Sequence, residues 1–280
     1  MSIRCFLSGA GRQEDVPSEL LQNEIVWQFN YDLILTRCKL YDTILTRCQN
    51  KGKEAKSMPR GSPERIKKRK SEILDACERI YREQGFYGVN IKEISTETSF
   101  TRPAIYNYFE TKEEILLGLL AREYERWCNE LEGMIPLGEK VSRAQLAEQI
   151  AHTLEKKETL LRILNMNLFE IEQNSRVERL AEFKKLYSRS VTALAQLLNA
   201  FKPDIPDKEC EAFCESFLAF LFGVYPFAFH TEKQKEAMNL AGVRFREPTI
   251  YQMVYQCLLR LIPDKIEHKN SSDDESIFQD

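Results

Sequence analysis

The sequence predicts an all-α protein in which a short helix-turn-helix unit precedes a larger helical domain. Apolar residues recur at three- and four-residue spacing over most of the chain beyond residue 64, as on one face of a helix. Side chains that cap helices stand before several of these stretches. Beyond residue 131, no run with the alternation of a β-strand interrupts the pattern. With 280 residues, the chain is long enough for two modest domains.

The composition is typical of a soluble globular protein, with 43% hydrophobic and 30% charged residues. The longest apolar run covers residues 217–229 and is interrupted by Gly223 and Pro226. This run is shorter than the roughly 20 residues that cross a bilayer. The apolar patch near residue 5 is too short for a secretory signal. We therefore expect a cytoplasmic protein with no membrane partner.

Cysteine and histidine usage gives no indication of a metal site or a cofactor. The eight cysteines include no C-x-x-C pair, which fits a reducing compartment. Cys210 and Cys214 lie four residues apart in a helical pattern, and none of the three histidines is near them in sequence. We interpret them as small apolar residues on one helix face. The chain also lacks a G-x-S-x-G motif and a glycine-rich phosphate loop, so we expect no enzyme activity.

Charge is distributed unevenly along the chain. Residues 60–70 hold six basic residues and one acidic residue, a net charge of +5, whereas residues 113–280 carry 21 basic and 28 acidic residues, a net charge of −7. A basic cluster on an acidic chain is typical of a phosphate-binding surface. A solvated first helical turn would give the same pattern, and composition alone leaves both readings open.

The first predicted helix covers residues 64–81. Its apolar residues Ile66, Ile73, Cys77 and Ile80 share one face, and Gly85 is placed to cap it in a left-handed conformation. A second, short helix should begin after Asn90, whose side chain can accept hydrogen bonds from the first free amides.

A third helix is predicted over residues 102–108, and a long fourth helix through residue 131. Thr101 is a helix-capping residue, and Pro103 is tolerated only in a first helical turn. Thr111 and Glu114 have the spacing of a capping box, which marks the start of the fourth helix. Two short helices joined by a tight turn and braced by a longer one form a helix-turn-helix.

The stretch "ILDACERIYREQGFYGVNIKEISTETSFTRPAIYNYFETKEEILLGLL" closely resembles the DNA-binding domain of the TetR family of transcriptional regulators. The resemblance covers about residues 64–116: a helix rich in Leu and Ala, Gly followed by an aromatic residue, a short helix, a recognition helix ending in Tyr-x-x-Phe, and a Lys-Glu step. One departure is Ser99-Phe100, where the family usually has Gly-Val. The resemblance implies an N-terminal three-helix DNA-binding domain at 58–112 and a helical ligand-binding and dimerisation domain at 113–266.

The resemblance also implies which residues contact DNA. Arg102 is suited to a bidentate contact with guanine and Asn107 to adenine, whereas lysines and hydroxyls contact phosphates. Core packing is the alternative for Tyr108. Base contacts are expected from Arg102, Pro103, Ala104, Asn107 and Lys92. Phosphate contacts are expected from Thr101, Tyr106, Tyr108, Lys112, Lys67, Lys68, Arg69 and Lys70.

Helical periodicity continues through the second domain. Leu146, Ile150 and Leu154 form one apolar stripe. In the TetR family the last two long helices form a homodimer, and here they would cover residues 207–230 and 249–261. Their aromatic residues would fit a monomer core equally well. A small-molecule inducer would occupy the core, and the candidate pocket residues, which could also be plain core, are Met166, Phe169, Tyr187, Phe217 and Tyr225.

The resemblance implies a dimeric, sequence-specific regulator that binds a palindromic operator, represses transcription and is released by an inducer. Two-fold symmetry is needed because one short recognition helix reads too few base pairs. The alternatives are an activator of the same fold and a non-specific DNA-coating protein. The acidic tail at 267–280 is expected to be disordered.

Residues 31–50, "YDLILTRCKLYDTILTRCQN", repeat a ten-residue unit in a part of the chain with no counterpart in the family. Residues 44–50 can be encoded as ATT-TTG-ACA-CGT-TGT-CAA-AAT, whose two arms are reverse complements around CGT, the dyad that a dimeric regulator needs. We therefore expect residues 1–57 to be either disordered or upstream DNA read as protein, with translation starting at Met58 and with autoregulation. A genuine N-terminal extension is the alternative.

Overall fold

The computed structural model describes residues 62–136 and 141–264, and within these ranges it contains helices and no strands. The segment at 1–57, including the doubled stretch, and the tail at 267–280 lie outside the described residues. The helices are α2 (Pro63–Gly88), α3 (Ile91–Thr96), α4 (Arg102–Tyr106), α5 (Lys112–Met134), α6 (Arg143–Glu155), α7 (Glu158–Met166), α8 (Leu168–Gln173), α9 (Val177–Phe201), α10 (Asp207–Gly223), α11 (Tyr225–Ala228), α12 (Glu232–Leu240) and α13 (Ile250–Leu261).

Helix α2 begins earlier and continues further than the sequence predicts. The Ser62 hydroxyl accepts a hydrogen bond from the Arg65 N–H (3.3 Å), and Pro63 occupies the first turn, where its missing N–H has no cost. The helix is broken at Gly85, with φ 71° and ψ −167°. The predicted positive φ at Gly85 is confirmed, but its ψ is not that of a left-handed cap. This region is open almost only to glycine.

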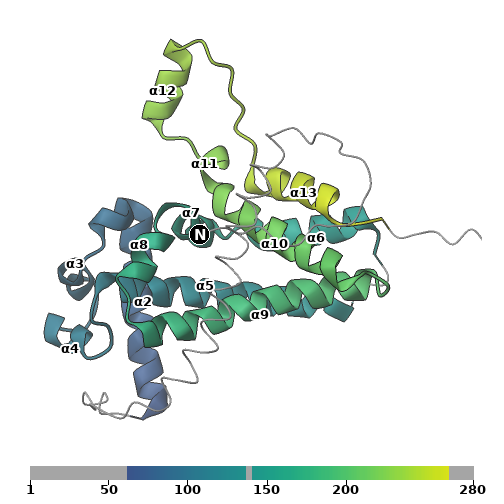
Figure 1. Ribbon diagram of the computed structural model, residues 1–280. Coiled ribbons are helices and arrows are strands. Elements are labelled where there is room, and N and C mark those ends of the chain that lie inside the picture. The colour runs from purple at the N-terminus through teal and green to yellow at the C-terminus, as the bar shows by residue number, and fades with distance from the viewer. Residues whose placement is uncertain (1–61, 137–140, 265–280) are drawn as a thin grey trace, which may run out of the picture. The chain divides into compact units, whose positions relative to one another are not determined.

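The predicted starts of α3 and α5 are confirmed by their caps. The Asn90 side chain accepts from the Glu93 N–H (2.9 Å), and the Thr111 hydroxyl accepts from the Glu114 N–H (3.1 Å). Helix α4 begins at the predicted Arg102 but ends at Tyr106, two residues early. These three helices and α2 form the predicted helix-turn-helix, with α3 and α4 on one side of α2 (Figure 1).

The turn between α3 and α4 is held by α2. The backbone N–H of Ser99 donates to the Glu72 carboxylate (2.7 Å), and Phe100 packs half-buried against the core. Arg79 forms an ion pair with Glu97 just before the turn (3.0 Å). The fold therefore accommodates Ser99-Phe100 in place of the usual Gly-Val, because Glu72 binds the Ser99 amide and the Phe100 ring packs against the core.

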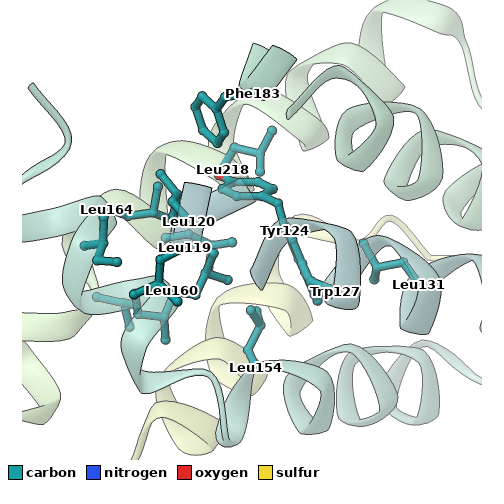
Figure 2. Close-up of a cluster of buried hydrophobic side chains, with 14 of the residues drawn as sticks. Leu119, Leu120, Tyr124, Trp127, Leu131, Leu154, Leu160, Leu164, Phe183 and Leu218 are labelled. Atoms are coloured by element: carbon teal, nitrogen blue, oxygen red, sulfur yellow. The ribbon is translucent and has the colours of Figure 1, made fainter. Parts of the chain in front are cut away.

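The rest of the described chain is a helical body organised around α5. Helix α5 packs along α9, and α6 packs along α13 (Figure 1). The predicted stripe of Leu146, Ile150 and Leu154 is fully buried. Figure 2 shows the centre of the core, where the Tyr124 ring lies 5.5 Å from that of Phe183 in an edge-on arrangement. The other residues that Figure 2 labels are Leu119, Leu120, Trp127, Leu131, Leu154, Leu160, Leu164 and Leu218.

The single helix predicted over residues 207–230 is wrong. Helix α10 ends at Gly223, and the one-turn helix α11 follows it. Pro226 has no N–H to donate to the carbonyl of Phe222, and the Asn165 side chain donates to that carbonyl instead (2.9 Å). Helix α12, which was not predicted from the sequence, comes next. Helix α13 begins after Thr249, whose capping box with Gln252 is complete, and it ends at the predicted Leu261.

Within residues 62–136 and 141–264, no helix combines the length and the apolar character that a membrane span requires.

Candidate nucleic-acid interface

The first turns of α3 and α5 and the two ends of α4 line an open depression of about 460 Å³, here called the α4 groove. Four residues predicted to contact DNA line it together, three cations and a phenol, beside the carboxylates of Glu110 and Glu113. The lining consists of Asn90, Ile91, Lys92, Arg102, Tyr106, Glu110, Thr111, Lys112 and Glu113.

Helix α4 is oriented by a single buried side chain. Ile105 is fully buried in the core, which turns the rest of the short helix outward. Arg102, Pro103 and Asn107 are exposed, and Ala104 is half-exposed. Lys92 on α3 is exposed beside them. All five side chains predicted to read bases are therefore at least partly exposed.

Lys112 lines the groove and is held in place by Phe86. Its ammonium lies 4.1 Å from the centre of the Phe86 ring and donates to the Phe86 carbonyl (3.5 Å). A cation above an aromatic face is attracted by the ring. Less side-chain entropy is then lost when Lys112 binds an anion. Thr111 caps α5 and donates to the Asn174 carbonyl (3.2 Å), and the Tyr106 ring is 54% exposed.

The predicted phosphate contacts do not all lie on one surface. Lys67 and Lys68 are exposed on α2. Arg69 donates to the Tyr108 hydroxyl (3.2 Å), and Lys70 faces a different cavity, between α2, α5 and α9. Tyr108 itself is only 3% exposed, so the structure places it in the core, the alternative that its aromatic ring allowed.

A buried carboxylate, that of Glu114, joins the groove to the helical body, although its position in the sequence predicts only a role in a helix cap. Glu114 is 1% exposed and accepts from the Arg176 guanidinium (2.8 Å to Nη2) and from the Glu110 N–H (2.8 Å). Burial alone would raise the pKa of Glu114, but the hydrogen bonds from Arg176 and from two backbone N–H groups outweigh it and lower that pKa below its usual value.

The Glu114 hydrogen bonds also raise the pKa of Arg176 further, so both groups are ionised near neutral pH. Arg176 pairs with Glu110 as well (3.1 Å). The turn that follows α4 is thereby fixed to the start of α9. The Thr111 and Glu114 spacing marks a helix start and is visible in the sequence, but a pairing across 62 positions is not.

The five residues predicted to line an inducer pocket are spread over the body. Met166 is 60% and Phe169 is 73% exposed, whereas Phe217 is fully buried. Tyr187 and Tyr225 are half-buried, and the Tyr225 hydroxyl donates to Glu158 (3.3 Å). None of the five lines the α4 groove or the cavity beside Lys70.

Comparison with known families gives two adjacent matches. Residues 73–119 match the model of the bacterial regulatory proteins of the tetR family, and residues 121–259 match the tetracyclin repressor-like C-terminal domain. A curated relative, the uncharacterized HTH-type transcriptional regulator YfiR of Bacillus subtilis (strain 168), is 33% identical over 57 residues. That match covers 20% of this chain and spans 28% of the relative's length.

Solved structures that resemble the chain include regulators from three organisms. FadR of Bacillus subtilis in complex with stearoyl-CoA is 16% identical, with a TM-score of 0.47 over 69% of this chain and 97% of that one. A TetR/AcrR family regulator of Thermobifida fusca is 21% identical, with a TM-score of 0.47 and coverages of 70% and 97%. A regulator of Saccharomonospora viridis in complex with choline is 15% identical, with a TM-score of 0.47 and coverages of 70% and 96%.

The two family models follow each other in the order that the helices require, the first on the helix-turn-helix and the second on the helical body. Their meeting point lies inside α5, the helix that connects the α4 groove with the core. The chain therefore belongs to the TetR family of transcriptional regulators, with an N-terminal helix-turn-helix domain and a helical C-terminal domain.

Proposed function

We propose that the protein is a homodimeric repressor that binds a palindromic operator through α4 and is released by a small-molecule inducer. The observation that carries this proposal is the α4 groove, where Lys92, Arg102 and Lys112 converge beside the exposed face of α4. An exposed short helix with Arg at its first position can enter a major groove, where Lys92 reaches the bases as well, while Lys112 and Tyr106 bind phosphates.

In this proposal each base-reading residue has a separate role. Arg102 donates two hydrogen bonds to a guanine, and Asn107 pairs with an adenine. Pro103 and Ala104 offer apolar surface to a thymine methyl group. Lys112 and the exposed Lys67 and Lys68 neutralise phosphates, which adds affinity but no sequence preference.

Dimerisation is supported by apolar side chains that the last helices leave partly exposed. Helix α13 buries Ile250, Val254 and Leu258, and six further apolar side chains on it pack half-buried against the core. They are Tyr251, Met253, Tyr255, Cys257, Leu259 and Leu261. A second copy of the same surface would cover them, as in isologous dimers. Phe227 and Phe229, in the segment between α10 and α13, are exposed as well.

Release by an inducer requires that the ligand favour a conformation with the wrong spacing of the two α4 helices. Helix α5 is a physical route for such a change, because it begins in the α4 groove and contributes Tyr124 and Trp127 to the centre of the body. The Glu114–Arg176 pair gives a second connection, from the end of α4 to α9.

The operator is tested by selection from random DNA followed by footprinting. A dimeric regulator should enrich one dyad-symmetric sequence and protect it as a discrete footprint. Uniform protection of any DNA would instead identify a non-specific coating protein.

Sedimentation equilibrium on the free protein checks the dimer, and Tyr255→Glu on α13 should give a monomer. A matched change on an exposed site of α12, Asn239→Glu, should leave the dimer intact.

Autoregulation is tested with a gel shift on the DNA that encodes residues 35–50. Binding with the same affinity as the selected sequence would support both the operator and the autoregulation. If the actual codons do not form the dyad, the proposed operator within this segment is ruled out.

Transcript levels in a strain lacking the gene separate repression from activation, because the transcripts of repressed genes rise when the protein is absent.

A further inference from the structure

A second cavity, here called the α2–α9 cavity, lies away from the α4 groove, between α2, α5 and α9. Its volume is about 240 Å³, equivalent to roughly eight water molecules. This space suits a small organic molecule. The lining consists of Lys70, Leu74, Phe109, Glu114, Leu117, Gly118, Ala121, Arg179, Glu182, Phe183 and Leu186.

The walls are mainly apolar, and the charged side chains among them are two cations, Lys70 and Arg179, and two carboxylates, Glu114 and Glu182. Glu114 is bound by Arg176, so it is not available to the other charged groups of the cavity. Arg179 pairs with Glu182 (3.0 Å), whose side chain is 65% exposed. Lys70 is the additional cation. Burial and the nearby charge of Arg179 lower the pKa of Lys70, and Glu182 offsets only part of this. The carboxylate of a bound ligand, placed between Lys70 and Arg179, would balance the positive charge of Lys70.

The cavity touches the residues that follow the recognition helix. Phe109 is 4% exposed and lines the cavity, and Arg179 donates to the carbonyl of Tyr108 (3.3 Å). Tyr108 and Phe109 come directly after α4 and its C-cap at Asn107. An anion that engages Arg179 would compete with the Tyr108 carbonyl for its N–H groups. An occupied cavity would therefore change how the end of α4 is held.

We propose that the α2–α9 cavity binds a small organic anion, with a compact apolar body among Leu117, Phe183 and Leu186 and a carboxylate on Lys70 and Arg179, and that the bound anion resets α4. The coupling to DNA rests on the proposed function, whereas the binding site does not. This cavity is distinct from the pocket that the sequence predicts, since it shares none of its residues.

Binding is measured by titration calorimetry on the full chain with two probes of the same body. Cyclohexanecarboxylate carries the anion, and cyclohexylmethanol is its neutral counterpart. The carboxylate should bind about tenfold more tightly, the factor expected for one additional charge-assisted hydrogen bond. Lys70→Met should remove this preference. Lys185→Met, which deletes an exposed cation on α9, should keep it.

A cavity-filling variant gives the independent test of location. Ala121→Leu adds a branched side chain to the cavity wall and should weaken both probes at least tenfold. If circular dichroism shows that this variant does not fold, the comparison of the two probes on the wild type and on Lys70→Met decides. Equal affinity for both probes, or binding that Ala121→Leu leaves unchanged, would overturn the site.

Coupling is measured as the affinity for the selected operator with and without cyclohexanecarboxylate. The carboxylate should change operator affinity in the wild type and leave it unchanged in Ala121→Leu. Binding of the carboxylate with no change in operator affinity would overturn the coupling. If the protein selects no operator at all, the proposed function fails, and calorimetry still decides whether the cavity is a binding site.

Discussion

Neutralising the buried Glu114 should lower the free energy of unfolding by more than the loss of one exposed carboxylate would. In Glu114→Gln the buried group remains similar in shape but loses its charge, and the Arg176 guanidinium loses the carboxylate that binds it through two nitrogens. Removing one partner of a buried pair costs about 3–5 kcal/mol. The Arg176 side chain is 39% exposed and keeps Glu110, so water and this second carboxylate recover part of the loss. We expect a loss of about 2 kcal/mol.

Urea denaturation at pH 7, followed by circular dichroism, measures this loss. Glu113→Gln is the matched control, because it removes the neighbouring charge from the same helix N-terminus, where a carboxylate contributes about 0.3–1 kcal/mol. Combining Glu114→Gln with Arg176→Gln completes a double-mutant cycle. A cost for Glu114→Gln no larger than that for Glu113→Gln, or additive changes in the cycle, would contradict a stabilising pair between Glu114 and Arg176.

The same variant gives a pH dependence of known sign. The folded pKa of Glu114 lies below its ordinary value of 4.5, so its contribution to stability is complete above that value and is lost as pH falls through the folded pKa. The difference in unfolding free energy between wild type and Glu114→Gln should therefore be constant at neutral pH and shrink below about pH 4.5. A difference that grows on acidification would contradict the lowered pKa.

Three further variants test the interface and the fold. Arg102→Ala should relax sequence preference at one base pair by about 1–3 kcal/mol in a selection experiment, and an unchanged preference would contradict the placement of α4. Lys112→Ala should weaken binding to all sequences alike and reduce the salt slope by about one in gel shifts, whereas a sequence-dependent effect would count against a phosphate contact. Gly85→Ala should lower stability by at least about 1 kcal/mol in urea titrations, because φ is 71° and the added carbon would lie 3.2 Å from Arg162; an unchanged midpoint would show that the break is not strained.

Local signals in the sequence predicted local structure well. The caps at Asn90 and Thr111 depend on hydrogen bonds within a single turn, so the residues that form them are neighbours in sequence. The order of the helices in the DNA-binding domain followed from such caps and from apolar periodicity. The continuous helix predicted at 207–230 was wrong, because α10 ends at Gly223 and Pro226 cannot continue its hydrogen-bond pattern.

The candidate site was predictable only in part, because exposure is a property of packing. Arg102 and Tyr108 lie in the same short segment, yet Arg102 is exposed and Tyr108 is buried with its hydroxyl on Arg69. The turn after α4 bends the chain back toward α2 and α9, and helical periodicity does not extend through a turn. Exposure also differs along α2. Lys67 and Lys68 are exposed, whereas Arg69 and Lys70 are half-buried because the helix turns them toward the core.

The all-α class, the helix-turn-helix and the family can be predicted from the sequence, because they depend on caps, periodicity and motifs that are contiguous in the chain. The contacts between distant segments emerge only when the helices pack. This packing joins Glu114 to Arg176, places Arg179 beside Lys70 and binds Arg179 to the carbonyl of Tyr108. These pairings depend on how α2, α5 and α9 pack against one another, and the hydrophobic effect that drives this packing is non-directional, so it specifies no partner for a charged side chain.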